Sequence, residues 1–156
     1  MEIRIAESGD LEPIAGVYAA CFPNESDHEA WVRASFRSHP RGVYYVATVD
    51  GAICGYILWC AKNGFRARTI AELEQVAIHP DFAGQGIGRT LIEESWKRFR
   101  RHIDELGHKV GAVLVTTAEG NFAERLYEST LGVSRSATLS DYGSGTEVIL
   151  YRRLEG

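Results

Sequence analysis

Three glycines at alternate positions, Gly84, Gly86 and Gly88, separate a predicted strand from a predicted helix. Glycine adopts positive φ angles at little steric cost and lets a ligand come close to the main chain. At the start of a helix the backbone N–H groups lack partners within the helix, and the helix dipole adds about half a positive charge. The spacing therefore predicts an anion site that suits a pyrophosphate group.

Two common phosphate-binding patterns do not match this loop. The Walker A pattern needs a glycine where the sequence has Ala83 and a lysine where it has Arg89. The dinucleotide-binding pattern is GxGxxG, whereas the glycines here are spaced GxGxG and no N-terminal strand–loop–helix unit precedes them. Both mismatches disfavour a nucleotide-binding protein. The remaining alternative is a tight strand-to-helix connection without a ligand, which would not need the conformational entropy that three glycines cost.

Two carboxylates, Glu72 and Glu74, lie on the predicted strand 70–79, two residues apart and hence on one face. A carboxylate on an apolar strand is costly unless it is exposed, paired or functional. An alkyl amine, with a pKa of roughly 10, must lose a proton before it acts as a nucleophile near pH 7. Either glutamate suits this general-base role, directly or through one water, and Glu72 is preferred because it lies farther from the glycine loop. The alternative for each is a solvated strand face.

Hydrophobic periodicity predicts the elements that position these residues. The strands are expected at 2–6, 44–49, 52–61, 70–79, 110–117, 133–139 and 146–154. Helices are expected after Ser8–Asp10, after a capping box of Ser26 and Glu29, from Ile87 to Leu106, and over 121–131. Asp50-Gly51 predicts a hairpin turn, and a second turn is expected at 141–145. This order predicts an α+β fold with helices on both faces of a mixed sheet.

Length and composition narrow the class of protein. A chain of 156 residues is the size of one domain, here 1–156, and needs neither metal nor disulfide for stability. The net charge of −4 disfavours a nucleic-acid partner. Three cysteines without CxxC spacing indicate a reducing compartment, and no apolar run suits a signal or a membrane span. No histidines have metal-ligand spacing. We therefore expect a cytoplasmic protein with no metal and no membrane partner.

The glycine loop and the strand before it resemble the central motif of the GNAT acetyltransferase superfamily. That motif pairs a strand, here Leu73–Pro80, with a loop of the form R/Q-x-x-G-x-G/A, here Ala83–Gly88, and a helix. Ala83 stands where the family has Arg or Gln. The order of elements over nearly all of the chain is similar as well. The resemblance implies a three-layer α/β/α fold with a mostly antiparallel central sheet, and acetyl-coenzyme A (acetyl-CoA) as co-substrate.

The resemblance also implies how the coenzyme is bound. Backbone amides of the loop would hold its pyrophosphate, and main-chain groups of the strand would pair with the pantetheine arm as an extra strand would. The loop residues are Gly84, Gln85, Gly86, Ile87, Gly88 and Arg89, and the strand residues are Val76, Ala77 and Ile78.

A second stretch, Asn121–Tyr127 followed by Leu131-Gly132-Val133, is similar to the family's N-x-x-A-x-x-L-Y helix. Asn121 stands one residue closer than is usual in the family. By the resemblance, Tyr127 would protonate the departing thiolate of coenzyme A or donate a hydrogen bond to its sulfur. Its alternative is a half-buried aromatic with an ordinary partner. Asn121 would either contact the pantetheine or cap the helix.

The acceptor is expected near residues 25–29, since the first two helices and their loop wall the acceptor site in the resembled family. Acidic groups there would favour a cationic primary amine, although they also complement a helix dipole. No arrangement suggests a covalent acyl-enzyme, so we expect direct attack in a ternary complex, with an N–H near Ala77 stabilising the oxyanion. The alternatives are a protein N-terminal acetyltransferase of the ribosomal-protein type and a non-catalytic acyl-CoA-binding module. The sequence leaves open whether the chain forms a homodimer.

Overall fold

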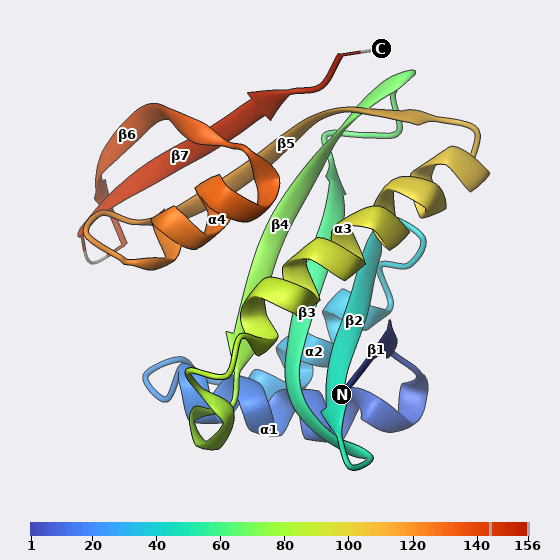
Figure 1. Cartoon of the computed structure of the whole chain (residues 1–156), viewed down its shortest axis with the longest axis vertical. Coiled ribbons are helices and arrows are strands. Elements are labelled where there is room, and N and C mark those ends of the chain that lie inside the picture. Colours follow the sequence, from blue (N-terminus) through green and yellow to red (C-terminus); the bar gives the residue numbers. More distant parts are fainter. Residues whose placement is uncertain (144, 156) are drawn as a thin grey trace. The chain divides into compact units, whose positions relative to one another are not determined.

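The computed structural model describes residues 1–143 and 145–155, and Figure 1 shows its elements. The strands are β1 (Glu2–Ile5), β2 (Gly42–Val49), β3 (Ala52–Lys62), β4 (Arg68–Ile78), β5 (Lys109–Ala118), β6 (Ser134–Tyr142) and β7 (Gly145–Arg153). The helices are α1 (Leu11–Cys21), α2 (His28–Phe36), α3 (Ile87–Glu105) and α4 (Ala123–Leu131), with 3-10 turns η1 (Ser8–Asp10) and η2 (Pro80–Phe82). Among the described residues the strands are hydrogen-bonded in the order β1-β2-β3-β4-β5-β7-β6. The predicted α+β fold with a mixed, mostly antiparallel sheet is confirmed.

The hairpin between β2 and β3 follows directly from two residues. Asp50 and Gly51 have φ angles of 51° and 80°, and Val49 pairs with Ala52 across the turn. Positive φ at both central residues defines the turn type whose twist matches that of two antiparallel strands. The Asp-Gly prediction is therefore confirmed. Ser144, within the second predicted turn, lies outside the described residues.

The chain divides into two compact units, which are described separately here. The first comprises Met1–Cys60 and Gln75–Phe99, and the second comprises Ala61–Glu74 and the chain from Arg100 onward. The glycine loop and the end of β4 belong to the first unit, whereas Glu72, Glu74 and Tyr127 belong to the second.

In the first unit, helices α1 and α2 cover one face of the strands. Their apolar residues form one core with alternate residues of β2 and β3 and with one residue of β4. The members of this core are Ala6, Leu11, Ile14, Ala15, Val17, Tyr18, Val32, Tyr44, Val46, Tyr56, Leu58 and Ala77. Burial of each large apolar side chain contributes about 1.5–3 kcal/mol, so this core fixes where the α1–α2 connection lies.

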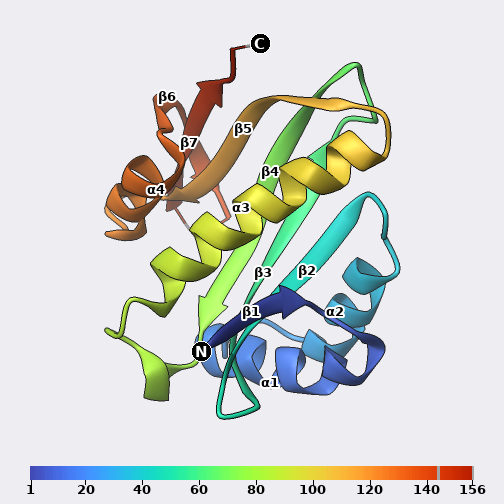
Figure 2. The same ribbon diagram turned by 45° about the vertical axis from the view of Figure 1, so that its right-hand side comes forward.

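Helix α3 covers the opposite face of the same strands, as Figure 2 shows. Trp59 is fully buried, and its indole Nε1 donates a hydrogen bond to Ser95 Oγ of α3 at 2.9 Å. The Trp59 ring stacks on Phe99 with centroids 5.8 Å apart. Because Trp59 and Leu58 are neighbours on a strand, they point to opposite faces, which is why helices cover both.

The second unit is built around β5. Strand β4 pairs with it in parallel from Arg68↔Lys109 to Leu73↔Val115, and β7 pairs antiparallel on its other side. The strand predicted at 110–117 is confirmed, and Val110, Ala112, Val113 and Val115 in it are buried. Helix α4 ends at Gly132, whose φ is 70°, and the Arg152 guanidinium donates to the carbonyl of Leu131 at 3.1 Å.

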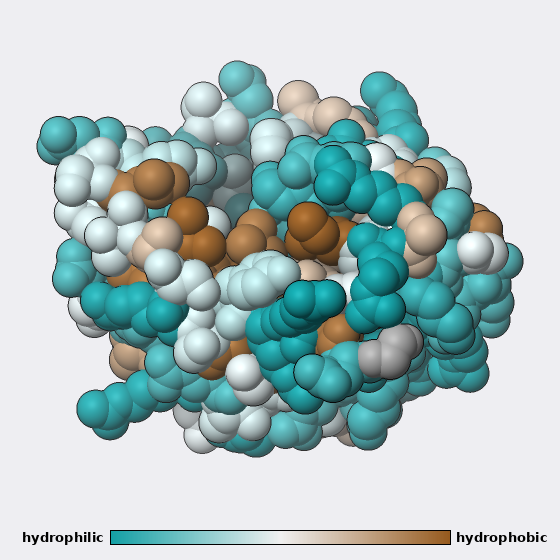
Figure 3. All heavy atoms as spheres, turned by 90° about the horizontal axis from the view of Figure 1, so that it is seen from above, coloured by the Kyte–Doolittle hydropathy of each residue, from teal (hydrophilic) through white to brown (hydrophobic). Residues whose placement is uncertain are grey.

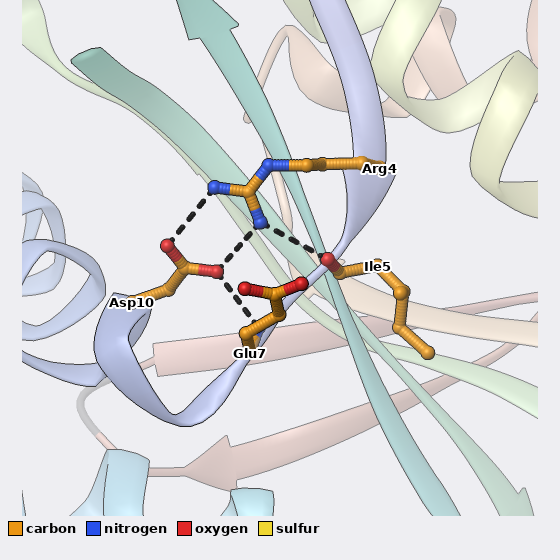
Figure 4. Close-up of polar contacts among 4 residues, drawn as sticks. All are labelled: Arg4, Ile5, Glu7 and Asp10. Carbon is orange, nitrogen blue, oxygen red and sulfur yellow. Dashed lines mark hydrogen bonds and ion pairs between the residues drawn. The ribbon is translucent and has the colours of Figure 1, made fainter. Parts of the chain in front are cut away.

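Two predicted side-chain caps are wrong, although α1 begins at Leu11, directly after Asp10, as expected. Helix α2 begins at His28 after a left-handed Asp27 (φ 54°), without a side-chain cap, and Glu29 instead binds Arg33 at 2.7 Å. At the first helix, the Asp10 carboxylate accepts a hydrogen bond from the backbone N–H of Glu7 at 2.7 Å instead of capping α1. Figure 4 shows the reason: the Arg4 guanidinium holds both carboxylate oxygens of Asp10, at 2.7 and 3.0 Å.

The face drawn in Figure 3 is mainly hydrophilic, with smaller groups of apolar residues between the polar ones. Across residues 1–143 and 145–155, no helix combines the length and the apolar character that a membrane-spanning segment requires.

Candidate functional site

The glycine loop lies between β4 and α3, where Figure 1 shows the chain passing through η2 into the helix. Gly84 and Gly86 both have a φ of +77°. A Cβ at either position would meet no atom within 4 Å. Conformation, not lack of space, therefore requires glycine at these two positions, because an L-residue in this region costs about 1–2 kcal/mol.

The amides of this loop are available to a ligand. Among the described residues, no hydrogen bond is donated by the backbone N–H of Gly84, Gln85, Gly86, Ile87 or Gly88. Farther into the helix, the N–H of Thr90 donates to the carbonyl of Gly86 at 3.2 Å. Successive amides at the start of a 19-residue helix make the geometry of an anion site.

The end of β4 offers main-chain groups beside this loop. The N–H of His79 donates to the carbonyl of Cys54 on β3 at 2.8 Å. The carbonyl of Ala77 also faces β3, since a Cβ built on Gly55 would lie 3.0 Å from it. Main-chain groups alternate along a strand, so those of Val76 and Ile78 point to the other side. The Cys21 thiol contacts the carbonyl of Ile78 there at 3.1 Å.

The two candidate bases have different surroundings. The Lys62 ammonium lies 3.2 Å from Glu72 Oε2, and the Glu72 side chain is 20% exposed. Glu74 is exposed. Pairing of β4 with β5 ends at Leu73, between the two glutamates. Glu72 therefore already has a cationic partner at the surface, and the base assignment stays a prediction.

Tyr127 lies on α4 and is 8% exposed. Burial raises the pKa of its hydroxyl to about 12. The neutral form, which can donate a proton or a hydrogen bond, therefore predominates throughout the neutral pH range.

Asn121 precedes α4. Its carboxamide oxygen accepts a hydrogen bond from the backbone N–H of Ala123 at 2.9 Å. This is a local turn bond just before the N-cap position, which is Phe122, and it occupies the carboxamide oxygen of Asn121.

Tyr44 and Trp59 lie in the core, where they are 2% and 0% exposed, so they do not line a surface site. Two acidic side chains of the segment 25–29 have different partners. Glu29 binds Arg33, whereas Glu25 accepts a hydrogen bond from the hydroxyl of Tyr18. The sequence analysis missed Tyr18 and Gln75, which are polar only at their tips and lie in otherwise apolar segments.

Comparison with known proteins agrees with this geometry. The family model described as "Acetyltransferase (GNAT) family" matches residues 11–133. An uncharacterized N-acetyltransferase of Archaeoglobus fulgidus is 29% identical over 105 residues, which are 61% of this chain and 71% of that protein.

Two solved structures share the fold. The ribosomal-protein-S18-alanine N-acetyltransferase of Escherichia coli has a TM-score of 0.75 and 19% identity, with 99% of this chain and 96% of that chain covered. An aminoglycoside 6'-N-acetyltransferase complexed with coenzyme A has a TM-score of 0.74 and 10% identity, with 98% and 97% covered. Identities this low show the fold alone, whereas the family match spans most of the sequence. The chain therefore belongs to the acetyltransferase (GNAT) family, and it is an acetyltransferase that acts with acetyl-CoA.

Proposed function

We propose that this enzyme transfers the acetyl group of acetyl-CoA to a small cationic primary amine, by direct attack of the amine in a ternary complex. The observation that carries the proposal is the row of amides from Gly84 to Gly88, which have no acceptor among the described residues. A diphosphate is the group in acetyl-CoA that such a row of N–H donors fits.

In this proposal, the loop from Gly84 through Gln85, Gly86, Ile87, Gly88 and Arg89 holds the pyrophosphate. The amide cradle depends on backbone geometry, so Ala83 in place of the family's Arg or Gln removes a side-chain contact and leaves the cradle. Positive φ at Gly84 and Gly86 gives this loop a conformation that residues with a side chain rarely adopt.

The pantetheine arm is proposed to lie along the end of β4, at the segment Val76, Ala77 and Ile78. The side of this segment that faces away from β3 presents the N–H groups of Val76 and Ile78. A main-chain N–H next to Ala77 would then stabilise the oxyanion that forms as the amine attacks.

The chemical step needs a base and an acid. The attacking ammonium loses one proton to Glu72 or Glu74, directly or through a water, and the amine nitrogen forms the bond to the acetyl carbon. The carbon–sulfur bond breaks, and the nitrogen releases its second proton to solvent. The Tyr127 hydroxyl gives its proton to the thiolate and regains one from solvent, or it donates a hydrogen bond to the thiolate. The burial that raises the pKa of Tyr127 keeps that proton available. In this proposal Asn121 contacts the coenzyme through the N–H groups of its carboxamide, because the carboxamide oxygen accepts a hydrogen bond from Ala123.

Two alternatives stay open. The first alternative is a protein N-terminal acetyltransferase, since the ribosomal-protein-S18-alanine N-acetyltransferase has the same fold. The aminoglycoside enzyme, which acts on a small amine, has this fold as well. A non-catalytic acyl-CoA-binding module would bind the coenzyme without consuming the thioester. We further propose that residues 1–156 form a single domain. We expect this domain to work in the cytoplasm and to need no metal. A homodimer is compatible with this activity.

The test is the release of free thiol from acetyl-CoA with a panel of amines: polyamines, aminoglycosides, amino acids and peptide N-termini. We expect thiol release with a small cationic amine and none without an acceptor. Release with peptide N-termini alone would favour the first alternative. Tight binding of acetyl-CoA with no release for any amine would overturn the proposal in favour of the binding module.

A further inference from the structure

A row of polar side chains runs through the first unit from its core to its surface. The hydroxyl of Tyr56 donates a hydrogen bond to Gln75 Oε1 at 2.9 Å. The carboxamide of Gln75 lies near the hydroxyl of Tyr18 and opposes the rise in its pKa, and this hydroxyl donates a hydrogen bond to Glu25 Oε1 at 2.5 Å. The row joins β3 and β4 to the connection between α1 and α2, and it ends on a carboxylate.

The two tyrosines of this row are buried, whereas Gln75 and Glu25 are more accessible. Tyr56 and Tyr18 are 0% and 3% exposed, Gln75 is half-buried, and Glu25 is exposed. Desolvation raises the pKa of Tyr18 to about 12, and the neighbouring carboxylate adds to this shift. The hydroxyl therefore stays a donor at neutral pH and holds the carboxylate in place. A buried hydroxyl that donates a hydrogen bond to an exposed carboxylate holds that carboxylate in one orientation.

The loop that carries Glu25 is fixed independently. The backbone N–H of Glu25 donates to the carbonyl of Phe22 at 3.2 Å, and His28 Nε2 lies 2.8 Å from the same oxygen. The His28 ring packs edge-on against Tyr18, with centroids 4.5 Å apart. The position of the carboxylate is thus set from both its backbone and its side chain.

Glu25 differs from the other anchored carboxylates in its charge balance. Asp10, Glu29 and Glu72 each have a basic partner, at 2.7, 2.7 and 3.2 Å. Among residues 1–143 and 145–155, no Lys or Arg lies within ion-pair distance of Glu25. The titratable groups that interact with this row are Tyr44, Cys21, Tyr18 and Glu25 itself. Glu25 is a fixed anion without a cation.

The row also lies directly beside the proposed site. Gln75 precedes Val76, whose main chain points to the side proposed for the thioester arm. The fixed carboxylate of Glu25 would therefore give the acceptor a charged contact near the place where its nitrogen must react.

We infer that Glu25, held by Tyr18 and joined through Gln75 to β4, receives the ammonium group of the acceptor amine. Glu25 then determines the specificity for a cationic acceptor, and Tyr18 and Gln75 act as positioning residues. This inference rests on the proposed function.

The experiment compares Glu25→Gln with Glu29→Gln, a matched control four residues on. Thiol release is measured against the concentration of spermidine, kanamycin and an alanyl peptide, each of which carries an ammonium group at pH 7.5. Loss of a charge-assisted hydrogen bond should raise the KM for the best of these acceptors about tenfold to a hundredfold in Glu25→Gln. The KM for acetyl-CoA should stay unchanged, and Glu29→Gln should behave as the wild type.

Tyr18→Phe tests the positioning role. It should raise the acceptor KM by a smaller factor than Glu25→Gln, with the acetyl-CoA KM and the thermal midpoint retained. In the double variant the Tyr18 effect should disappear, because the carboxylate that it positions is gone.

An unchanged acceptor KM in Glu25→Gln, or an equal rise in Glu29→Gln, would overturn the inference while the wild-type activity leaves the proposed function standing. If the wild type releases no thiol with any of the three amines, the proposed function fails and the inference fails with it.

Discussion

Lys62 holds Glu72 by an ion pair of 3.2 Å between Nζ and Oε2, whereas Glu74, two residues later on the same strand, is exposed. The ion pair fixes the direction in which the Glu72 carboxylate points, and Glu74 is the more solvated of the two candidate bases.

The first prediction concerns the base. Glu72→Gln should lower kcat by about 10²–10⁴ if Glu72 removes the proton, because this is the usual contribution of general-base catalysis. The deficit should shrink at high pH, where the amine loses its proton to solvent. Steady-state kinetics between pH 7 and 10 check this, with Glu74→Gln as the control. A large loss in Glu74→Gln alone would move the role to Glu74, and no loss in either would exclude both.

The second prediction concerns the glycine loop. Gly86→Ala places a side chain at a φ of +77°, which costs about 1–2 kcal/mol, so affinity for acetyl-CoA should fall about fivefold to thirtyfold. Isothermal titration calorimetry measures it. Gly16→Ala is the matched control: it lies in α1, has open space at its Cβ, and should stabilise the helix by about 0.5–1 kcal/mol without changing affinity. Unaltered coenzyme affinity in Gly86→Ala would count against the loop assignment.

The third prediction concerns Tyr127. Tyr127→Phe should lower kcat about tenfold or more and leave the KM for acetyl-CoA nearly unchanged, because the hydroxyl acts on the departing sulfur. Since burial raises its pKa to about 12, the hydroxyl stays protonated below that value. An alkaline fall in wild-type activity between pH 8 and 10 should therefore persist unchanged in Tyr127→Phe. If the variant keeps the full wild-type kcat, Tyr127 is a core aromatic only.

The fourth prediction concerns stability at low pH. The Arg4 guanidinium lowers the pKa of Asp10 by its hydrogen bonds, and the Glu7 N–H adds to this. A lowered folded-state pKa gives stability that is present above the ordinary Asp pKa of about 3.9 and is lost as pH falls through the folded-state value.

Asp10→Asn should therefore lower the free energy of unfolding by about 1–2 kcal/mol at pH 7, since Arg4 stays partly solvated. The difference from the wild type should shrink below pH 4. Urea unfolding at pH 7 and pH 3 measures both, and Glu12→Gln, on the exposed start of α1, is the control. A difference that is the same at both pH values would show that the ion pair does not carry the effect.

Local patterns were sufficient for the elements whose conformation depends on neighbours in sequence. Asp50-Gly51 determined a hairpin turn because only residues that tolerate positive φ fit it. The capping box of Ser26 and Glu29 failed because Arg33, one turn along α2, takes the Glu29 carboxylate. Asp10 failed as a cap because Arg4 on β1 takes its carboxylate. In both cases the carboxylate binds a basic side chain instead of the backbone N–H groups at the start of the α-helix.

The sequence by itself determined the order of strands and helices, the position of the glycine loop and the family, because glycine spacing and hydrophobic period act over a few residues. The tertiary structure alone decided which polar side chains meet. Gln75 lies 19 residues from Tyr56, and they meet because β3 and β4 are neighbours in the sheet; Tyr18, 57 residues from Gln75, joins the same core because α1 packs on the strands. Contacts across such separations depend on how a core buries its apolar faces, and no local pattern records that.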